Sequence, residues 1–421
     1  MNKNLLIIYL LLSLALSQTE TEVKINLFQK KALFLNLTNL KNGLYNQNVT
    51  DSNVSFKHVY NTKRGNSLNL QWFLNENEIV LQNFSFYVKK KYGVFKIGQF
   101  PIEKIYMQNN YSSGSMIISE NAKYIPAISF NTNWLKINNL LDIKFELYQG
   151  KFLSQKNYSE GPYLHYKSVL FRKKINHSVI GFSVQHAVQF GGVNQYGEKI
   201  PLNPRLFFRM IAAQNGDESQ PKIDQNYKIG NGLGSYTFFV SNDLYNGNLN
   251  TYYEHFFDDK SGTKMKNLQD GLFGLEYSND VFEILFENLN TRNQSGNQHP
   301  PGVDSYYWHQ TYEFGWTNKG LSIGNSLINP ESNRKLVNTL TSKVKFSSIE
   351  IITQISNIKE YIPYKDKNNN EPYENELDIL ANNNNYILGI NKERANGHTV
   401  SLFFARYNSN SNIQLSYKLS F

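Results

Sequence analysis

The sequence predicts an all-β protein, namely a transmembrane antiparallel β-barrel of about eighteen strands. Three features point to this architecture: a carboxy-terminal stretch of strict apolar and polar alternation, an amino-terminal stretch typical of exported proteins, and an aromatic-rich composition. Aromatic residues make up 14% of the chain and charged residues only 18%. Because a barrel needs an apolar side chain only at every second strand position, a polar mean hydropathy is compatible with it.

The last nine residues, 413–421, alternate between apolar and polar and end on an aromatic residue. In a strand, Leu415 and Phe421 would share one face, and Gln414 and Ser420 the other. An edge strand of a soluble sandwich shows the same alternation, but an ordered terminal strand needs something to hold it. In a transmembrane barrel the last strand pairs with the first, its apolar face meets lipid, and its polar face meets a wet lumen.

The amino terminus predicts export. Lys3 precedes an apolar run at residues 5–16, and residues 15–17 form a small-x-small cleavage site. The run is shorter than the roughly 20 residues that a helix needs to span a bilayer. We therefore expect a signal peptide at 1–17, cleaved near Ser17, followed by a single outer-membrane barrel domain at 18–421. The chain has no cysteine, so it forms no disulfide.

Alternation typical of strands recurs along the chain. Its clearest internal case is 141–147, where Asp142, Lys144 and Glu146 alternate with apolar residues. Charges of both signs on one face suit a hydrated lumen and would be costly in a dry core. Further strands are expected at 33–38, 68–74, 84–88, 94–100, 179–190, 236–240, 282–288, 344–352, 386–390 and 399–407.

Turn-rich stretches of very different length separate these strands. At roughly 22 residues for a strand and its share of loop, the mature chain holds about eighteen strands. Residues 332–340 are the best candidate for a short helix. The turn-rich stretches are 231–235, 246–248, 258–262, 293–302, 368–370 and 382–385.

The motifs of the chain favour binding over catalysis. Residues 320–324 match the pattern of a hydrolase nucleophile elbow around Ser322, but turn-like residues follow where that motif needs a helix. The eight histidines lack the spacing of known zinc motifs. The net charge of +9 favours anionic partners, yet no stretch concentrates it into a nucleic-acid-binding patch. We therefore expect no enzyme activity, catalytic residue, metal, cofactor or nucleic-acid partner.

Residues 306–316 (YYWHQTYEFGW) are the richest candidate for a binding site. Flat aromatic faces beside amide, carboxylate and hydroxyl groups suit a sugar, because its C–H faces stack on rings while its hydroxyls need hydrogen-bond partners. The aromatic girdle of a transmembrane barrel has the same composition. The composition of this stretch therefore leaves both interpretations open.

Five short stretches, taken in order, resemble the Wzi family of capsule assembly proteins as found in Bacteroidetes. This resemblance covers nearly the whole mature chain and implies an outer-membrane barrel of a Gram-negative bacterium, its lumen occluded by loops or a small plug. It also implies a lectin-like protein that ties capsular or exopolysaccharide to the cell surface. Ala187 and Phe190 depart from the family, which often has Trp there, and Lys260 stands where Gly is usual. The stretches are HAVQFGG (186–192), DDKSG (258–262), QDGLFG (269–274), TRNQSG (291–296) and YEFGWTNKGLSIGN (312–325).

The resemblance and the charge together predict a monomeric barrel that contacts outer-membrane lipid and binds an anionic polysaccharide. The alternative is a channel for sugars or other solutes, in which Asp142, Lys144 and Glu146 line an open path. Both functions need a polar lumen, so the sequence does not separate them. The expected sugar-stacking residues are Tyr306, Tyr307, Trp308 and Trp316, and the expected hydrogen-bonding residues are Gln189, Glu313 and Asn325.

Overall fold

The computed structural model describes most of the chain that follows the predicted signal peptide. Residues 1–17 and the strand expected at 33–38 lie outside the described residues. No helix in the described part is long and apolar enough to cross a membrane. The described residues are 19–28, 53–62, 65–74, 79–103, 111–137, 140–153, 160–194, 196–226, 228–258, 260–294, 305–312, 314–361, 379–394, 397–407 and 410–420.

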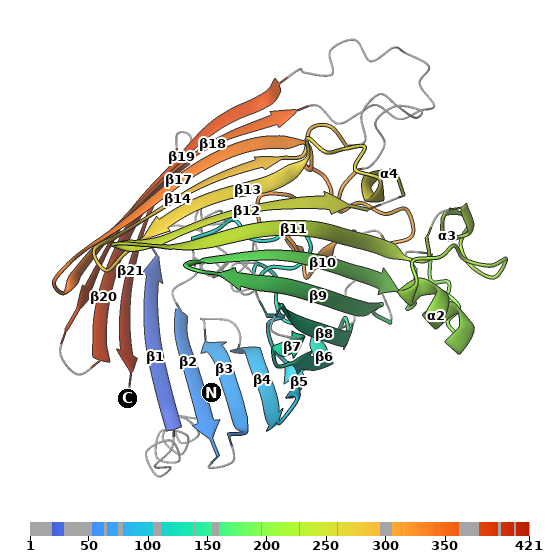
Figure 1. Ribbon diagram of the computed structural model, residues 1–421, viewed down its shortest axis with the longest axis horizontal. Coiled ribbons are helices and arrows are strands. Elements are labelled where there is room, and N and C mark those ends of the chain that lie inside the picture. The colour runs from blue at the N-terminus through green and yellow to red at the C-terminus, as the bar shows by residue number, and fades with distance from the viewer. Residues whose placement is uncertain are drawn as a thin grey trace.

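The strands form one closed antiparallel barrel (Figure 1). β6 (Pro126–Thr132) and β7 (Leu135–Ile137) pair one after the other with β8 (Leu141–Lys151), so they share one position and the barrel has 18 strand positions. The last strand, β21 (Asn410–Ser420), pairs with the first, β1 (Thr19–Phe28), which confirms the predicted closure. The other wall strands are β2 (Asn53–Asn61), β3 (Ser67–Leu74), β4 (Ile79–Lys90), β5 (Gly93–Gln99), β9 (Tyr163–Ile175), β10 (Ser178–Phe190), β11 (Asn231–Leu244), β12 (Gly247–Phe257), β13 (Gly271–Ser278), β14 (Phe282–Asn290), β17 (Lys335–Phe346), β18 (Ile349–Tyr361), β19 (Ile379–Glu393) and β20 (His398–Tyr407).

Side chains of the wall alternate between an apolar outer face and a more polar inner face. On β21, Leu415 is 43% exposed and its neighbour Gln414 only 9%. On β8, Leu147 is 52% exposed and Glu146 only 4%. The outward positions are apolar and uncovered by protein, so they form the lipid-facing band of a transmembrane barrel. The alternation predicted for these two stretches is confirmed over their described residues, 413–420 and 141–147, and Phe421 lies outside the described residues.

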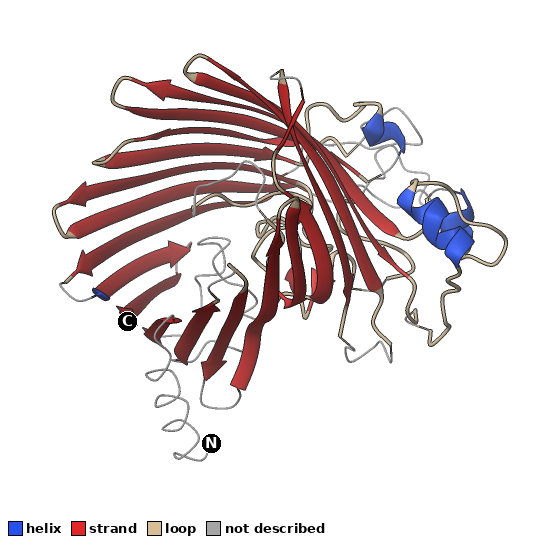
Figure 2. Cartoon of the chain, turned by 60° about the horizontal axis from the view of Figure 1, so that its bottom comes forward, coloured by secondary structure: helices blue, strands red, loops and turns tan. Residues whose placement is uncertain are grey.

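The two ends of the barrel differ in the length of their connections. One end carries two-residue turns such as those after β9 and β17, in which Asn176 and Ser347 adopt positive φ angles of 52° and 53°. The other end carries the long connections with α2 (Pro204–Ile211), α3 (Lys222–Asn226) and α4 (Lys260–Thr263), as Figures 1 and 2 show. Outer-membrane barrels place short turns in the periplasm and long loops outside the cell. We therefore take the long-loop end as extracellular and the short-turn end as periplasmic.

The structure differs from the expected elements at four places. The single strand expected at 344–352 is divided by a turn at residues 347–348 between β17 and β18. The helix expected at 332–340 is wrong, because β17 occupies most of it. The loops expected at 231–235 and 382–385 are strand residues of β11 and β19. The asparagine run in β19 pairs with β18 over its whole length, and this pairing holds it extended despite its low strand propensity.

Two connections from the long-loop end turn back into the lumen. They are residues 111–125, between β5 and β6, and residues 305–312 and 314–334, between β14 and β17; we call these segments the plug. The plug includes the small hairpin β15 (Thr317–Asn318) and β16 (Leu321–Ser322). Its apolar side chains form one core with inward residues of the wall, which occupies space that an open channel would need. The core includes Met116, Ile117, Tyr306, Trp316 and Ile323 from the plug, and Tyr148, Leu164, Tyr252, Phe256 and Leu289 from the wall.

Candidate functional site

Two buried carboxylates hold the first plug segment against the wall. Glu287, on the inner face of β14, accepts hydrogen bonds from the Ser112 hydroxyl at 2.6 Å and the Ser113 backbone N–H at 2.7 Å. Glu254, on β12, accepts from the Ser115 hydroxyl at 2.7 Å and the Met116 backbone N–H at 3.0 Å. An ionised carboxylate only accepts, so it suits a hydroxyl and an adjacent N–H, and such charge-assisted bonds are the stronger kind.

The second plug segment binds the first through side chains that reach backbone carbonyls. The Trp316 indole N–H donates to the Ile117 carbonyl at 2.8 Å, and the Tyr307 hydroxyl donates to the Met116 carbonyl at 2.7 Å. Asn325 donates to the Gly114 carbonyl at 2.6 Å. The wall carboxylates therefore hold the first segment, and the first segment holds the second.

Asp270 joins the long loops at the rim. It directly precedes β13 and accepts hydrogen bonds from the backbone N–H groups of Asn293 at 2.8 Å and Gln294 at 2.6 Å. It also accepts from the hydroxyl of Tyr306 at 2.7 Å, and that hydroxyl in turn accepts from Asn267. Burial raises the pKa of Asp270 to about 6 although these donors favour its ionised form.

We expect Tyr306→Phe to loosen this rim, because it removes one donor from buried Asp270 and leaves the Asn267 amide one partner short. The local cost should be about 1–3 kcal/mol, visible as faster hydrogen exchange at the Asn293 and Gln294 amides. With one donor fewer, the pKa of Asp270 should rise further above about 6. Because this folded pKa exceeds the unfolded value, the contribution of Asp270 to stability is largest at acid pH and is lost as the pH rises through the folded pKa.

The matched control is Tyr245→Phe in the short turn between β11 and β12, where the side chain is fully exposed. Exchange at the rim amides should not change in that variant. Equal exchange in Tyr306→Phe and the parent would show that the Tyr306 hydroxyl does not hold the rim.

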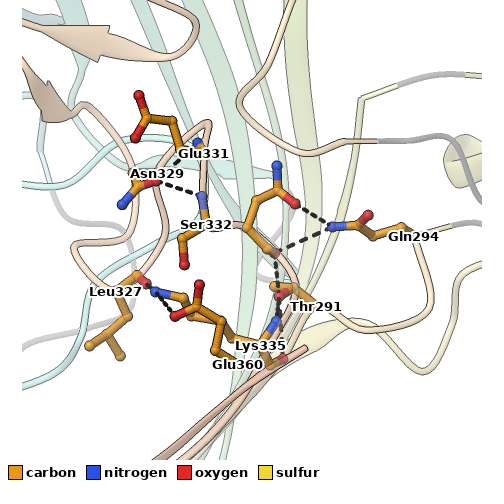
Figure 3. A network of polar contacts seen from close by, with 9 residues as sticks. Thr291, Gln294, Leu327, Asn329, Glu331, Ser332, Lys335 and Glu360 are labelled. Carbon is orange, nitrogen blue, oxygen red and sulfur yellow. Dashed lines mark hydrogen bonds and ion pairs between the residues drawn. The ribbon is translucent and has the colours of Figure 1, made fainter. Parts of the chain in front are cut away.

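A second network fixes the two ends of the connection between β14 and β17 (Figure 3). The Thr291 hydroxyl donates to the Asn333 carbonyl at 2.7 Å and accepts from the Lys335 backbone N–H at 2.8 Å. The Lys335 ammonium donates to the Leu327 carbonyl at 2.9 Å and lies 3.9 Å from the Glu360 carboxylate (Figure 3). These contacts bring the end of the loop back to its beginning, which positions the plug segment between them.

The structure gathers four of the expected sugar-binding residues, but inside the plug. Tyr306, Tyr307, Trp316 and Asn325 are at most 1% exposed and hydrogen-bonded to protein. A direct sugar-stacking or hydroxyl-binding role does not fit this arrangement, because a ligand would first have to displace the plug. Gln189 is also buried, on the inner face of β10, where it accepts from Asn231 at 3.2 Å.

Trp308 has a different environment from its two neighbours. Its side chain is 52% exposed, whereas Tyr306 and Tyr307 are buried. The reason is local: Tyr307 has a φ of 71°, and this left-handed turn redirects the chain after two inward side chains. Glu313, the remaining predicted residue, lies outside the described residues.

Further exposed aromatic rings lie on the connection between β10 and β11. Tyr196 is 76% exposed, and Phe208 on α2 is 68% exposed. Asn203 caps α2 by accepting from the Leu206 backbone N–H at 2.9 Å, and this cap starts the helix that carries Phe208 and Arg209. Exposed rings beside basic side chains at the extracellular end can stack on sugars and pair with acidic groups.

Sequence patterns did not predict a role for four residues that hold the plug, namely Ser112, Ser115, Glu254 and Glu287. The signal in the sequence was an acidic residue at an inward position of an aromatic-rich strand: Glu254 is the only acidic residue of β12, and Glu287 follows Glu283 on the same face of β14. Ser322, in the elbow-like motif, donates to the Ile328 carbonyl and is buried. Among the described residues, no group of three or more His, Asp or Glu side chains is placed to hold a metal ion.

Comparisons with known proteins place the fold among outer-membrane barrels. No protein-family model matches the chain, and no curated protein matches it by sequence. The structure is similar to Wzi of Escherichia coli, a carbohydrate-binding β-barrel of the outer membrane involved in group 1 capsule assembly. The TM-score is 0.67 at 12% sequence identity, over 99% of this chain and 88% of that one. OccD3 of Pseudomonas aeruginosa also matches, with a TM-score of 0.47 at 10% identity over 96% and 92% of the two chains.

This level of identity shows the fold alone. The closed barrel, its lipid-facing band and its similarity to Wzi match the outer-membrane proteins of Gram-negative bacteria. The chain is therefore an outer-membrane β-barrel with loop segments folded into its lumen.

Proposed function

We propose that this barrel is a Wzi-like, lectin-like protein that binds capsular or exopolysaccharide at its extracellular end and anchors it to the cell surface. The observation that carries this proposal is the plug, which two wall carboxylates hold inside the lumen. A barrel whose lumen is filled in this way can hold its extracellular loops rigidly. It leaves little room for a solute to pass through. The carbohydrate-binding character of the structurally similar Wzi supports the same role.

The inward charges that could have lined a solute channel are engaged or buried. Asp142 accepts from Arg172 at 3.1 Å, and Lys144 pairs with Glu103 from the connection that folds into the lumen. Glu146 is only 4% exposed. Conduction needs a continuous wet path, so these contacts favour anchoring over the alternative function of sugar or solute transport.

In this proposal Trp308, Tyr196 and Phe208 offer rings to the polymer, and Arg205 and Arg209 of α2 meet its acidic groups. The net charge of +9 supports an anionic polymer. The buried aromatic residues of the plug, Tyr306, Tyr307 and Trp316, act indirectly in this proposal, because they hold the extracellular loops in place. The role requires neither catalysis nor a cofactor, and a single barrel in outer-membrane lipid is sufficient for it.

The decisive experiment measures polysaccharide in the cell pellet and in the culture supernatant of a strain lacking this gene and of its parent. Anchoring predicts an unchanged total with a larger share in the supernatant. An unchanged partition would contradict the proposal and make solute transport the leading function.

We expect Trp308→Ala to weaken retention without loosening the barrel, because the exposed ring contributes to binding and not to the core. Loss of one stacking ring should lower affinity for the polymer about three- to tenfold. The readout is the share of polysaccharide shed by cells that carry the variant. Tyr245→Ala is the control, since Tyr245 is equally aromatic and fully exposed at the opposite end of the barrel. Equal shedding in the two variants would remove Trp308 from the site.

A further inference from the structure

A cavity lined mainly by polar residues opens inside the barrel near its short-turn end, away from the extracellular loops. Its volume is about 310 Å³, within the range of small-molecule sites and closer to one sugar ring than to a polymer. Val94 and Lys144 lie within four residues of short turns, which places the cavity toward the periplasm. Lys96, Glu103, Asn131 and Trp134 also line it.

A break in the wall directs a tryptophan toward this cavity. Asn131 pairs with Glu146, and Leu135 pairs with Ile143, so the chain advances four residues between β6 and β7 while β8 advances three. The extra residue is a bulge, which reverses the inward and outward alternation. Asn133 and Trp134, which lie at the bulge, both line the cavity in consequence.

Two cations hold the indole of Trp134 in place, and the more distant one is the Lys144 ammonium, 6.0 Å from the centre of the ring. The Arg172 guanidinium lies 3.6 Å from the centre of the ring, and its Nε donates to Asp142 at 3.1 Å. A cation stacked on an indole and fixed by its own ion pair keeps the ring from rotating. A ligand in the cavity would therefore meet a preorganised aromatic surface.

Two lysines, Lys96 and Lys144, and one glutamate, Glu103, line the cavity. Glu103 pairs with Lys144 and accepts from Asn131 at 2.9 Å. The Lys96 ammonium lies over the rings of Tyr87 and Phe100, at 5.3 and 5.9 Å, and no carboxylate in the described part of the chain forms an ion pair with it. The carboxylates of Glu103 and Glu146 act on this ammonium only at longer range. Lys96 therefore retains room for a direct contact with an anionic group.

Hydroxyl-binding groups complete the lining. Thr132 accepts from the Phe145 backbone N–H at 2.9 Å, so its own hydroxyl proton can be donated. Asn133 donates to the Lys91 carbonyl at 2.9 Å, which leaves its amide oxygen as an acceptor. A donor and an acceptor on adjacent residues suit the hydroxyls of a sugar.

We propose that this cavity binds a single acidic sugar unit, with its carboxylate on Lys96, its hydroxyls on Thr132 and Asn133, and a C–H face against Trp134. This inference does not depend on the anchoring role, because it concerns the opposite end of the barrel and a single sugar ring. The site would present a sugar acid, free or at the end of a polymer, to the periplasmic mouth.

The test is titration of the purified protein in detergent with sodium glucuronate, followed by calorimetry and by tryptophan fluorescence. We expect saturable binding, at least tenfold weaker binding of glucose and of phosphate, and loss of the fluorescence change in Trp134→Phe. Lys96→Gln should raise the dissociation constant for glucuronate about tenfold while leaving that for glucose unchanged. Lys90→Gln, at the same barrel end but outside the lining, is the matched control.

The inference is overturned by no binding of glucuronate at millimolar concentration, by equal binding of glucose, or by an unchanged affinity in Lys96→Gln. Phosphate that binds as tightly as glucuronate would show an anion site without sugar recognition and would also overturn it. Mobility on an unheated gel checks that each variant remains folded. An oligosaccharide ending in glucuronate, compared with the free acid, separates the two sources of the ligand. The anchoring proposal is tested separately, by the loss of polysaccharide retention in cells that lack this gene.

Discussion

Replacing Glu254 and Glu287 together by Gln is expected to open the lumen. In the parent protein these carboxylates accept two hydroxyl and two backbone N–H groups of the first plug segment. An amide keeps the shape of the side chain but loses the charge, and it turns an NH₂ toward a donor at each site. The plug then loses charge-assisted bonds and gains unsatisfied buried groups.

The expected size of this effect follows from the cost of each site. At about 1.5–3 kcal/mol per carboxylate, the double variant should raise the population of a displaced plug by about 100-fold or more. The second plug segment should leave with the first, because Trp316, Tyr307 and Asn325 attach to residues 114–117. Single variants should show a smaller effect than the double variant.

Conductance in planar bilayers measures this outcome directly. We expect the parent to be silent and the double variant to show frequent or steady openings. Glu22→Gln is the control, since Glu22 pairs with Lys418 at 3.2 Å on strands β1 and β21. Steady conductance in the parent would contradict the closed lumen, and a silent double variant would show that the carboxylates do not retain the plug.

Trp316→Ala should destabilise the plug more than any other single aromatic truncation. The ring is completely buried, and its N–H donates to the Ile117 carbonyl at 2.8 Å. Truncation of a buried Trp costs about 3–5 kcal/mol through lost packing and the cavity left behind, and here it also leaves a carbonyl unpaired. The barrel wall should still form, because its strands pair independently of this side chain.

Hydrogen exchange of residues 111–125 and 314–334 measures this loosening, with the wall strands as an internal reference. Trp316→Phe, which keeps most of the ring volume, should fall between the parent and Trp316→Ala. Trp308→Ala should leave exchange unchanged, because its ring is half exposed. Similar exchange in Trp316→Ala and Trp308→Ala would show that burial of Trp316 does not hold the plug.

Strict alternation was enough to predict the wall. The period of two along 413–421 and 141–147 separates a lipid face from a lumen face, and closure follows because a membrane tolerates no unpaired strand edge. The approximate number of strands follows from chain length. Local signals failed where pairing outweighed them, as in the asparagine run at 382–385, which is held in β19.

The tertiary structure alone decided the role of the aromatic stretch. Tyr306, Tyr307 and Trp308 are adjacent and chemically alike, yet two are buried in the plug and one is exposed. Their environments depend on contacts with distant residues, such as the bond from Tyr307 to Met116, 191 positions away. Periodicity reports which face of a strand a side chain takes, but it carries no information on a loop that folds back into the lumen. The sequence by itself therefore determined the barrel and its two faces, while packing of the returning loops decided which residues remain free to bind.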